Sequence, residues 1–307
     1  MNPAFSVVIF TTIAGAAQGM VVALALARLA GMAMAPSFLG AALLVAEAML
    51  LIGLGASFGH LGRPERAWRA AMMWRTSWLS REVIVLPAFM AVVALWWAAL
   101  HWGVDTVWLP LAAIVLAALL WYCTAMIYAC LRFVQEWAQP LTLVNFALIG
   151  LSSGLVLTSA LAALRGQSPL LQAAGPAALA VTVVAWITRT MALRRNAVLR
   201  HASTLQSATG IRAPNLVQKS MGMSAGSFNT REFFHHASLL AMRNVKRALI
   251  VLGFALPTVL LLWGVATASG LAFGLALAVQ VPGLVAERWF FFAQARHPQN
   301  LYYQVVS

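Results

Sequence analysis

Charged residues are scarce in this chain, and acidic ones are the scarcest. Of its 307 residues only 9% are charged, whereas 62% are hydrophobic, and the mean hydropathy is +0.85. So few polar side chains cannot cover the surface of a water-soluble globule, and lipid must therefore be the main solvent. The composition predicts an integral membrane protein and excludes a soluble globular one.

Cysteine is almost absent, and this limits the metal chemistry of the chain. Cys123 and Cys130 lie seven residues apart in one apolar run, without a second pair, and we interpret them as packing residues. Two thiolates cannot hold an iron–sulfur cluster, and no histidine lies deep enough in an apolar run for a bis-histidine haem. We therefore expect no metal, haem or iron–sulfur cluster in this chain, and any such electron carriers must belong to partner chains.

Basic residues outnumber acidic ones by twenty to seven, which gives a net charge of +13. In a soluble protein this excess would suggest a nucleic-acid partner. Here lysine and arginine stand in the connections beside apolar runs, so we expect anionic lipid headgroups and no nucleic acid.

Apolar runs long enough to cross about 30 Å of hydrocarbon recur along the chain. They lie at residues 4–28, 37–59, 83–101, 108–131, 141–164, 170–188, 247–267 and 271–286. The first run lacks the basic start and the short length of a cleavable signal, so we expect it to be retained as a span. The sequence predicts an all-α membrane protein with one polytopic domain, residues 1–307, built as a bundle of eight transmembrane helices.

Eight spans place both termini on one side, together with the connections at about 60–81, 132–140 and 189–246. All but Arg28 and Arg165 of the twenty basic residues fall on that side. The positive-inside rule therefore predicts that the termini and these loops are cytoplasmic.

Glu47 stands in the middle of the apolar run LLVAEAMLL. A carboxyl group at that depth is costly unless it is paired, protonated or facing water, so Glu47 is a candidate functional residue. It is either a proton carrier or a neutral acid that is hydrogen-bonded between helices. A proton-coupled secondary transporter using Glu47 is an alternative of another class, although no repeat or broken helix supports it.

The connection HLGRPERAWRA, residues 60–70, and the following SWLSREV concentrate charge between two apolar runs. Pro64 can start a short interfacial helix, and Ser80 is the expected N-cap of the third span, with Glu82 in its first turn. His60 and Glu82 could offer a donor and a proton-exchanging group to a quinone head. The alternative is that both residues only cap helix ends.

These two segments resemble the membrane anchor subunits of the dimethyl sulfoxide reductase family, which includes the anchor of membrane-bound sulfite dehydrogenase. The resemblance extends through STLQSATGI at 203–211, SFNTREFF at 227–234 and AERWFFFAQARHPQNLYYQ at 286–304, and so covers essentially the whole chain. It implies a quinone-reactive anchor in a bacterial inner membrane, without catalytic residues of its own. The implied partners are a molybdopterin catalytic subunit and a ferredoxin-like iron–sulfur subunit.

The resemblance also implies roles for residues of the charged connection. Binding of a quinone, either ubiquinone or menaquinone, is implied for His60, Gly62, Arg63, Arg66 and Glu82. A proton relay is implied for Glu82, with Glu47 as a further candidate. Docking of the iron–sulfur subunit or of lipid phosphates is implied for Arg69, Arg75 and Arg81.

The expected topology bears on the direction of electron flow. Dimethyl sulfoxide reductases of this family typically face the periplasm and the sulfite-oxidising type faces the cytoplasm, so cytoplasmic loops favour sulfite oxidation coupled to quinone reduction. The alternatives are the anchor of a dimethyl sulfoxide reductase that oxidises menaquinol, and a purely structural anchor with quinone bound elsewhere.

Overall fold

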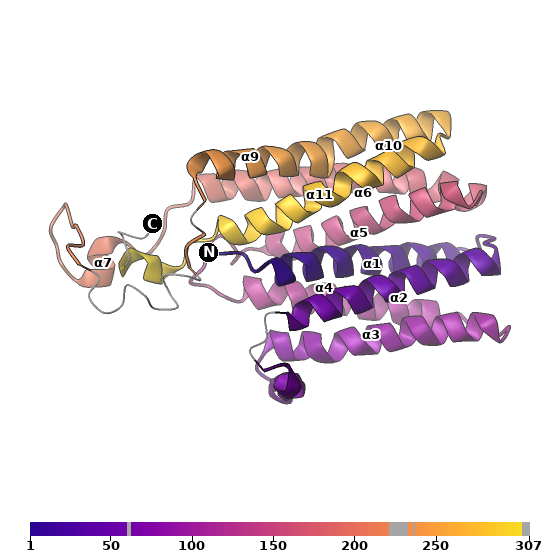
Figure 1. The fold of residues 1–307 in the computed structure, drawn as a ribbon, viewed down its shortest axis with the longest axis horizontal. Helices are drawn as coiled ribbons and strands as arrows, with labels where there is room; N and C mark the ends of the chain where they lie inside the picture. Colours follow the sequence, from indigo (N-terminus) through magenta and orange to yellow (C-terminus); the bar gives the residue numbers. More distant parts are fainter. Residues whose placement is uncertain (60–62, 221–232, 236, 303–307) are drawn as a thin grey trace.

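A computed structural model of the chain describes residues 1–59, 63–220, 233–235 and 237–302. Long helices run side by side along the long axis of the molecule (Figure 1). In the described residues, eight helices are long and apolar enough to cross a membrane, and no strand is present. The predicted all-α bundle of eight spans is therefore confirmed.

Seven spans are single helices and the remaining one is composite. The single helices are α1 (Phe5–Leu29), α2 (Pro36–Phe58), α3 (Trp78–His101), α4 (Trp108–Ala129), α5 (Pro140–Leu164), α6 (Ser168–Ala197) and α11 (Gly270–Ala293). The composite span joins α9 (Leu239–Ile250), the π-helical turn η3 (Val251–Ala255) and α10 (Leu256–Thr267). Short elements lie outside the spans, namely η1 (Pro64–Met73), α7 (Leu205–Thr209) and η4 (Pro298–Tyr302).

The two ends of the bundle differ. Residues 1–4 and 294–302 lie at one end, here named the terminal end, together with η1 and α7 (Figure 1). The connections at the opposite end are short turns, at residues 30–35, 102–107, 165–167 and 268–269. This arrangement agrees with the predicted grouping of the termini and the charged connections on one side.

The centre of the bundle depends on a close approach of α1 and α5. Each of these helices carries a GxxxG pair, Gly15 with Gly19 and Gly150 with Gly154. A Cβ atom on Gly154 would lie 2.1 Å from the carbonyl carbon of Gly19, and one on Gly19 would lie 2.1 Å from the carbonyl oxygen of Gly150. Small residues at such positions let helix backbones meet directly, which is a main source of packing energy in membranes.

Two of the predicted connections are too long. The connection predicted at 189–246 extends only over 198–238, because α6 continues to Ala197 and α9 already begins at Leu239. The connection predicted at 60–81 ends at residue 77, because α3 begins at Trp78. Basic residues near the ends of these helices lower the local hydropathy, so hydropathy alone makes each span too short.

The predicted end of the last span, residue 286, is also wrong. α11 continues to Ala293, and Glu287 and Arg288 are almost fully buried within it. Local hydropathy treats two adjacent charges as a boundary, although charges can remain inside a bundle when other helices provide their partners.

Candidate functional site

The start of α3 sets the position of Glu82. Ser77, not Ser80, is the N-cap, and its Oγ accepts a hydrogen bond from Ser80 N–H at 3.3 Å. Glu82 therefore lies in the second helical turn, away from the free N–H groups of the first. The prediction that Ser80 caps the helix with Glu82 in its first turn is wrong, because Ser77 adopts the extended conformation of an N-cap three residues earlier.

The Glu82 side chain is buried between α3 and α4. Only 6% of the residue is exposed, and the Thr124 hydroxyl on α4 donates a hydrogen bond to its carboxylate. Among the described residues, no lysine, arginine or histidine forms an ion pair with Glu82. A buried carboxyl group with a neutral hydroxyl partner is suited to take up and release a proton.

The other predicted quinone ligands do not gather around Glu82 in the described part of the chain. His60 and Gly62 lie outside the described residues. Arg63 and Arg66 are exposed, and the Arg66 guanidinium lies 3.9 Å from the neighbouring Glu65 carboxylate. The roles of all four in quinone binding stay predictions.

The three predicted docking arginines lie against tryptophans that are close to them in sequence. The guanidinium of Arg69 is 5.5 Å from the ring centroid of Trp68, and that of Arg75 is 5.3 Å from Trp74. Arg69 and Arg75 are both exposed, so each can still contact an anion while it lies against its tryptophan.

Arg81 differs from these two arginines because its guanidinium binds backbone carbonyl groups and so stabilises the local fold. It donates hydrogen bonds of 2.9 Å to the carbonyl oxygens of Trp74 and Arg75, and it lies 4.0 Å from the Trp78 ring centroid. These contacts hold the turn that leads from η1 into α3. Its role in docking stays a prediction.

Glu47 lies halfway along α2 and is half-buried. Its Oε2 atom is shielded from solvent and has no hydrogen-bond partner among the described residues. The position agrees with a residue at membrane depth. Its role as a proton relay stays a prediction.

The structure also shows a charged cluster that the sequence analysis missed. Arg189 on α6 lies 2.8 Å from the Glu287 carboxylate on α11, and Arg288 lies 3.5 Å from the same carboxylate. Glu136, in the connection before α5, is 4% exposed and lines a small cavity together with these three residues. The signal that could have revealed the cluster is a spacing of seven residues between buried polar positions on several spans.

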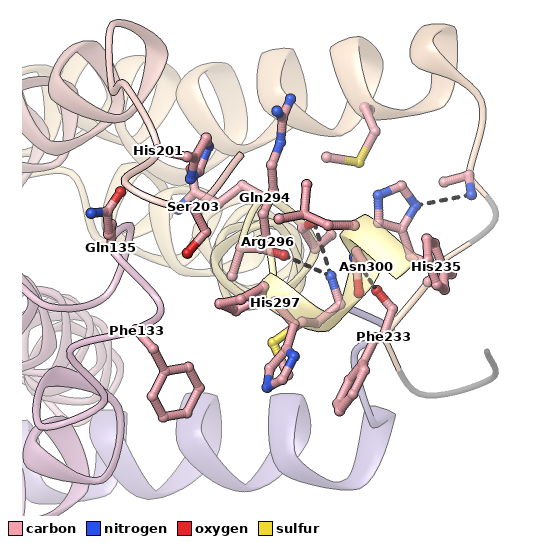
Figure 2. Close-up of a pocket in the computed structure, with 18 of the residues that line it drawn as sticks. Phe133, Gln135, His201, Ser203, Phe233, His235, Gln294, Arg296, His297 and Asn300 are labelled. Atoms are coloured by element: carbon pink, nitrogen blue, oxygen red, sulfur yellow. Dashed lines mark hydrogen bonds between the residues drawn. The ribbon is translucent and has the colours of Figure 1, made fainter. Parts of the chain in front are cut away.

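A large cavity of about 1070 Å³ opens at the terminal end of the bundle. Figure 2 shows side chains from three distant parts of the chain around it, including His201, Phe233 and Arg296. Its wall includes parts of all three later segments that carry the family resemblance: Ser203, Phe233 and Phe234, and residues 293–298, 300 and 301. The motifs are thus distant in sequence but meet in space.

His297 forms the aromatic part of this cavity wall. Its ring is stacked on Phe233 at a centroid distance of 4.0 Å and meets Phe133 edge-on at 5.4 Å (Figure 2). Burial, with a smaller contribution from the nearby N-terminal ammonium group, lowers the pKa of His297. Protonation of this ring therefore requires a lower pH than protonation of an ordinary histidine.

Comparison with known proteins shows to which family the chain belongs. The family model described as DMSO reductase anchor subunit (DmsC) matches residues 1–275. The chain belongs to this family. It is also 46% identical, over 327 aligned positions that cover the whole of both chains, to a protein of Allochromatium vinosum that is named as a subunit of sulfite dehydrogenase.

Membership of the DMSO reductase anchor family confirms the resemblance of the charged connection and the later motifs. The chain is thus a multi-pass membrane anchor subunit of an oxidoreductase complex that includes catalytic and iron–sulfur subunits. The family favours this function over the alternative of a proton-coupled transporter using Glu47.

Proposed function

We propose that this anchor subunit passes electrons between a ferredoxin-like iron–sulfur subunit and membrane quinone, and that Glu82 exchanges the accompanying protons. The observation that carries the proposal is the buried Glu82 carboxylate, held by Thr124 directly after the charged connection. Molybdopterin and the iron–sulfur clusters belong to the partner subunits.

Reduction of a quinone to a quinol takes up two electrons and two protons. The electrons arrive from the iron–sulfur subunit, and Glu82 passes protons to the quinone oxygens and regains them from water at the terminal end. His60 and Arg66 are the donors proposed to orient the quinone carbonyls, with Gly62 and Arg63 completing the site. Thr124 fixes the carboxylate of Glu82 but does not itself transfer the proton to the quinone.

Sulfite oxidation coupled to quinone reduction is the proposed overall reaction. Two observations support this direction: the name of the Allochromatium vinosum relative, and the concentration of basic residues at the terminal end. By the positive-inside rule, that end faces the cytoplasm of a bacterial inner membrane. The alternative, a dimethyl sulfoxide reductase that oxidises menaquinol, is supported by the family description.

We also propose that η1 lies in the membrane surface and binds anionic lipid headgroups. Its short coil, purple beyond α3 in Figure 1, is seen nearly end-on, whereas the spans run across the picture, so η1 lies across the bundle axis. Large apolar side chains on or directly after η1 are more than half exposed: Trp68, Met72, Met73 and Trp74. Tryptophans and arginines together are typical of the boundary between hydrocarbon and headgroups.

The proposed electron transfer is tested on the purified complex. Metal analysis and mass spectrometry should find molybdenum, iron and the two partner subunits with the anchor. Sulfite oxidation with a soluble dye and with a quinone analogue is then compared in wild type, Glu82→Gln and Glu65→Gln. Glu65 is the matched control because it is an exposed acid in the connection that leads into α3.

We expect Glu82→Gln to keep the dye activity and to lose quinone-linked turnover, while Glu65→Gln keeps both. Unchanged quinone turnover in Glu82→Gln would exclude Glu82 as the proton-exchanging group. Activity with menaquinol and dimethyl sulfoxide, but not with sulfite, would assign the alternative reaction.

A further inference from the structure

Buried polar side chains recur at intervals of seven residues on three helices, α5, α6 and α11. Seven residues are about two helical turns, so the members of each set lie along one face of their helix. The sets are Asn145, Ser152 and Ser159 on α5, Thr182 and Arg189 on α6, and Gln280 and Glu287 on α11. We name these residues the polar ladder.

Hydrogen bonds connect the three helices in the middle of the membrane. The Ser152 and Thr182 hydroxyls are 2.7 Å apart, and Gln280 Nε2 donates to Ser152 Oγ at 3.1 Å. All three residues lie near the centres of their helices and are at most 1% exposed. The Oε1 atom of Gln280 has no protein partner among the described residues.

The ladder becomes charged two turns closer to the terminal end. Arg189, Glu287, Arg288 and Glu136 form two positive and two negative groups around a cavity of about 10 Å³. Each of these residues is at least nine-tenths buried. Because the charges balance, no additional ion is required.

This small cavity has the size and the chemistry of a water site. A buried water needs roughly 10–15 Å³ and two to four polar partners. Four buried atoms of the lining residues have no hydrogen-bond partner among the described residues: Arg189 Nε, which makes only the ion-pair contact to Glu287, Arg189 Nη2, Glu287 Oε2 and Glu136 Oε2. A water molecule would offer hydrogen bonds to both signs of charge.

Glu136 connects the small cavity with the large one at the terminal end. Its Oε1 atom accepts a hydrogen bond of 3.2 Å from the Arg296 backbone N–H and lies 3.7 Å from His201 Nε2. Both Arg296 and His201 line the large cavity (Figure 2). The Glu136 side chain thus contacts residues of the large cavity and also lines the small one.

The ladder is closed toward the opposite end. There the fully buried ring of Phe273 on α11 lies against Gly175 on α6, so closely that a Cβ atom on Gly175 would be 3.0 Å from Phe273 Cζ. Phe273 and Gly175 stand seven residues beyond Gln280 and Thr182, where the next polar rung would be expected. The ring fills this place with an apolar surface, and the Ser159 hydroxyl at the same level of α5 already donates a hydrogen bond of 2.8 Å to the Leu155 carbonyl oxygen of its own helix.

We propose that the polar ladder is a one-sided inlet for water, and for the protons that water carries, from the terminal end to the middle of the membrane. Glu136 lies at the entrance of the inlet, the Arg189–Glu287 pair lines it, and the Phe273 ring closes its far end. Aromatic contacts link the charged cluster to the Glu82 site by packing, because Arg288 lies over Phe146, which stacks on Tyr128, one turn after Thr124. The inference does not depend on the assignment of quinone to this protein.

Hydroxyl-radical footprinting of the intact complex in lipid nanodiscs tests the inlet directly. Radiolysis in ¹⁸O-labelled water modifies side chains that lie next to water, and mass spectrometry locates the label. Phe146 and Phe291 line the small cavity, whereas Phe273 is an equally buried ring at the closed end. Phe273 is therefore the internal control.

We expect several-fold more ¹⁸O label on Phe146 and Phe291 than on Phe273, and a loss of this excess in Glu136→Leu. Equal, low labelling of all three rings in the wild type would overturn the proposal, whether or not the variant assembles. Strong labelling of Phe273 as well would contradict the closure and indicate a path open at both ends.

Discussion

The Arg189 guanidinium and the Glu287 carboxylate lie 2.8 Å apart in the interior of the bundle, with at most 3% of either side chain exposed. They belong to helices that are distant in sequence, α6 and α11. A charge in such a place is tolerated only with a partner, because burial removes its hydration. The pair therefore constrains how the second half of the bundle assembles.

Removing one member of this pair should lower the free energy of unfolding far more than removing both. We expect Arg189→Leu to destabilise the protein by roughly 3–5 kcal/mol, since it leaves Glu287 with only the longer contact to Arg288. In the double variant Arg189→Leu, Glu287→Leu, much of this loss should be recovered. Thermal unfolding in detergent of the wild type, of Arg189→Leu and Glu287→Leu alone, and of the double variant gives the coupling energy between the two residues. Simple additivity of the two single effects would argue against a functional ion pair.

The close contact of α1 and α5 predicts a marked difference between two glycines. Gly154→Ala would place a methyl group 2.1 Å from a backbone carbon of α1, so the helices must separate, at a cost of about 1–3 kcal/mol or more. Gly274 on α11 has open space around its Cβ position, so Gly274→Ala should be neutral or slightly stabilising. Melting temperatures of both variants check this, and equal melting temperatures would show that the approach is not tight.

Thr124 should act by positioning Glu82. Thr124→Val removes the hydroxyl and keeps the shape, and we expect kcat/KM for quinone to fall roughly 3- to 10-fold, as for the loss of one hydrogen bond to a carboxylate. Thr124→Ser should retain most of the activity and the wild-type pH profile. If Val and Ser variants behave alike, the hydrogen bond has no part in turnover.

The proposed position of η1 in the membrane surface can be measured with spin labels. A label at Met72→Cys, in a chain with Cys130→Ser, should collide more often with lipid-soluble oxygen than with a water-soluble nickel chelate, since Met72 is 67% exposed on η1. The matched control is Arg212→Cys, an exposed site in the long connection after α6. Preference of the Met72 label for the nickel chelate would place η1 in water.

The lowered pKa of His297 predicts a loss of stability in acid. The unfolded chain takes up a proton near the ordinary pKa of about 6.5, whereas the folded protein does so only at lower pH. Stability is therefore complete above about pH 6.5 and declines as the pH falls below that value. Between pH 7.5 and 5.5 the melting temperature of the wild type should fall more than that of His297→Phe, a variant that keeps the aromatic stacking. Equal decreases in the two proteins would exclude His297 as the cause.

The sequence is most informative where a property is local. Each of the eight spans can be located from its own hydropathy, because crossing a bilayer requires a continuous apolar stretch. Helix ends are harder to locate, since Ser77 and Ser80 are chemically equivalent caps and only the path of the backbone distinguishes them. The neighbours of Glu82 in the chain mark it as a candidate, but they do not reveal its hydrogen-bond partner Thr124.

By itself, the sequence determined that this protein is a polytopic membrane bundle with its charge gathered at one end, because composition and charge placement can be read residue by residue. Only the tertiary structure decided that Arg189 and Glu287 neutralise each other, that the polar positions of α5, α6 and α11 face one another, and that three distant motifs form one cavity. The physical reason is that the cost of a buried charge depends on its partner in space. A single helix does not contain that partner, so no local pattern can reveal it.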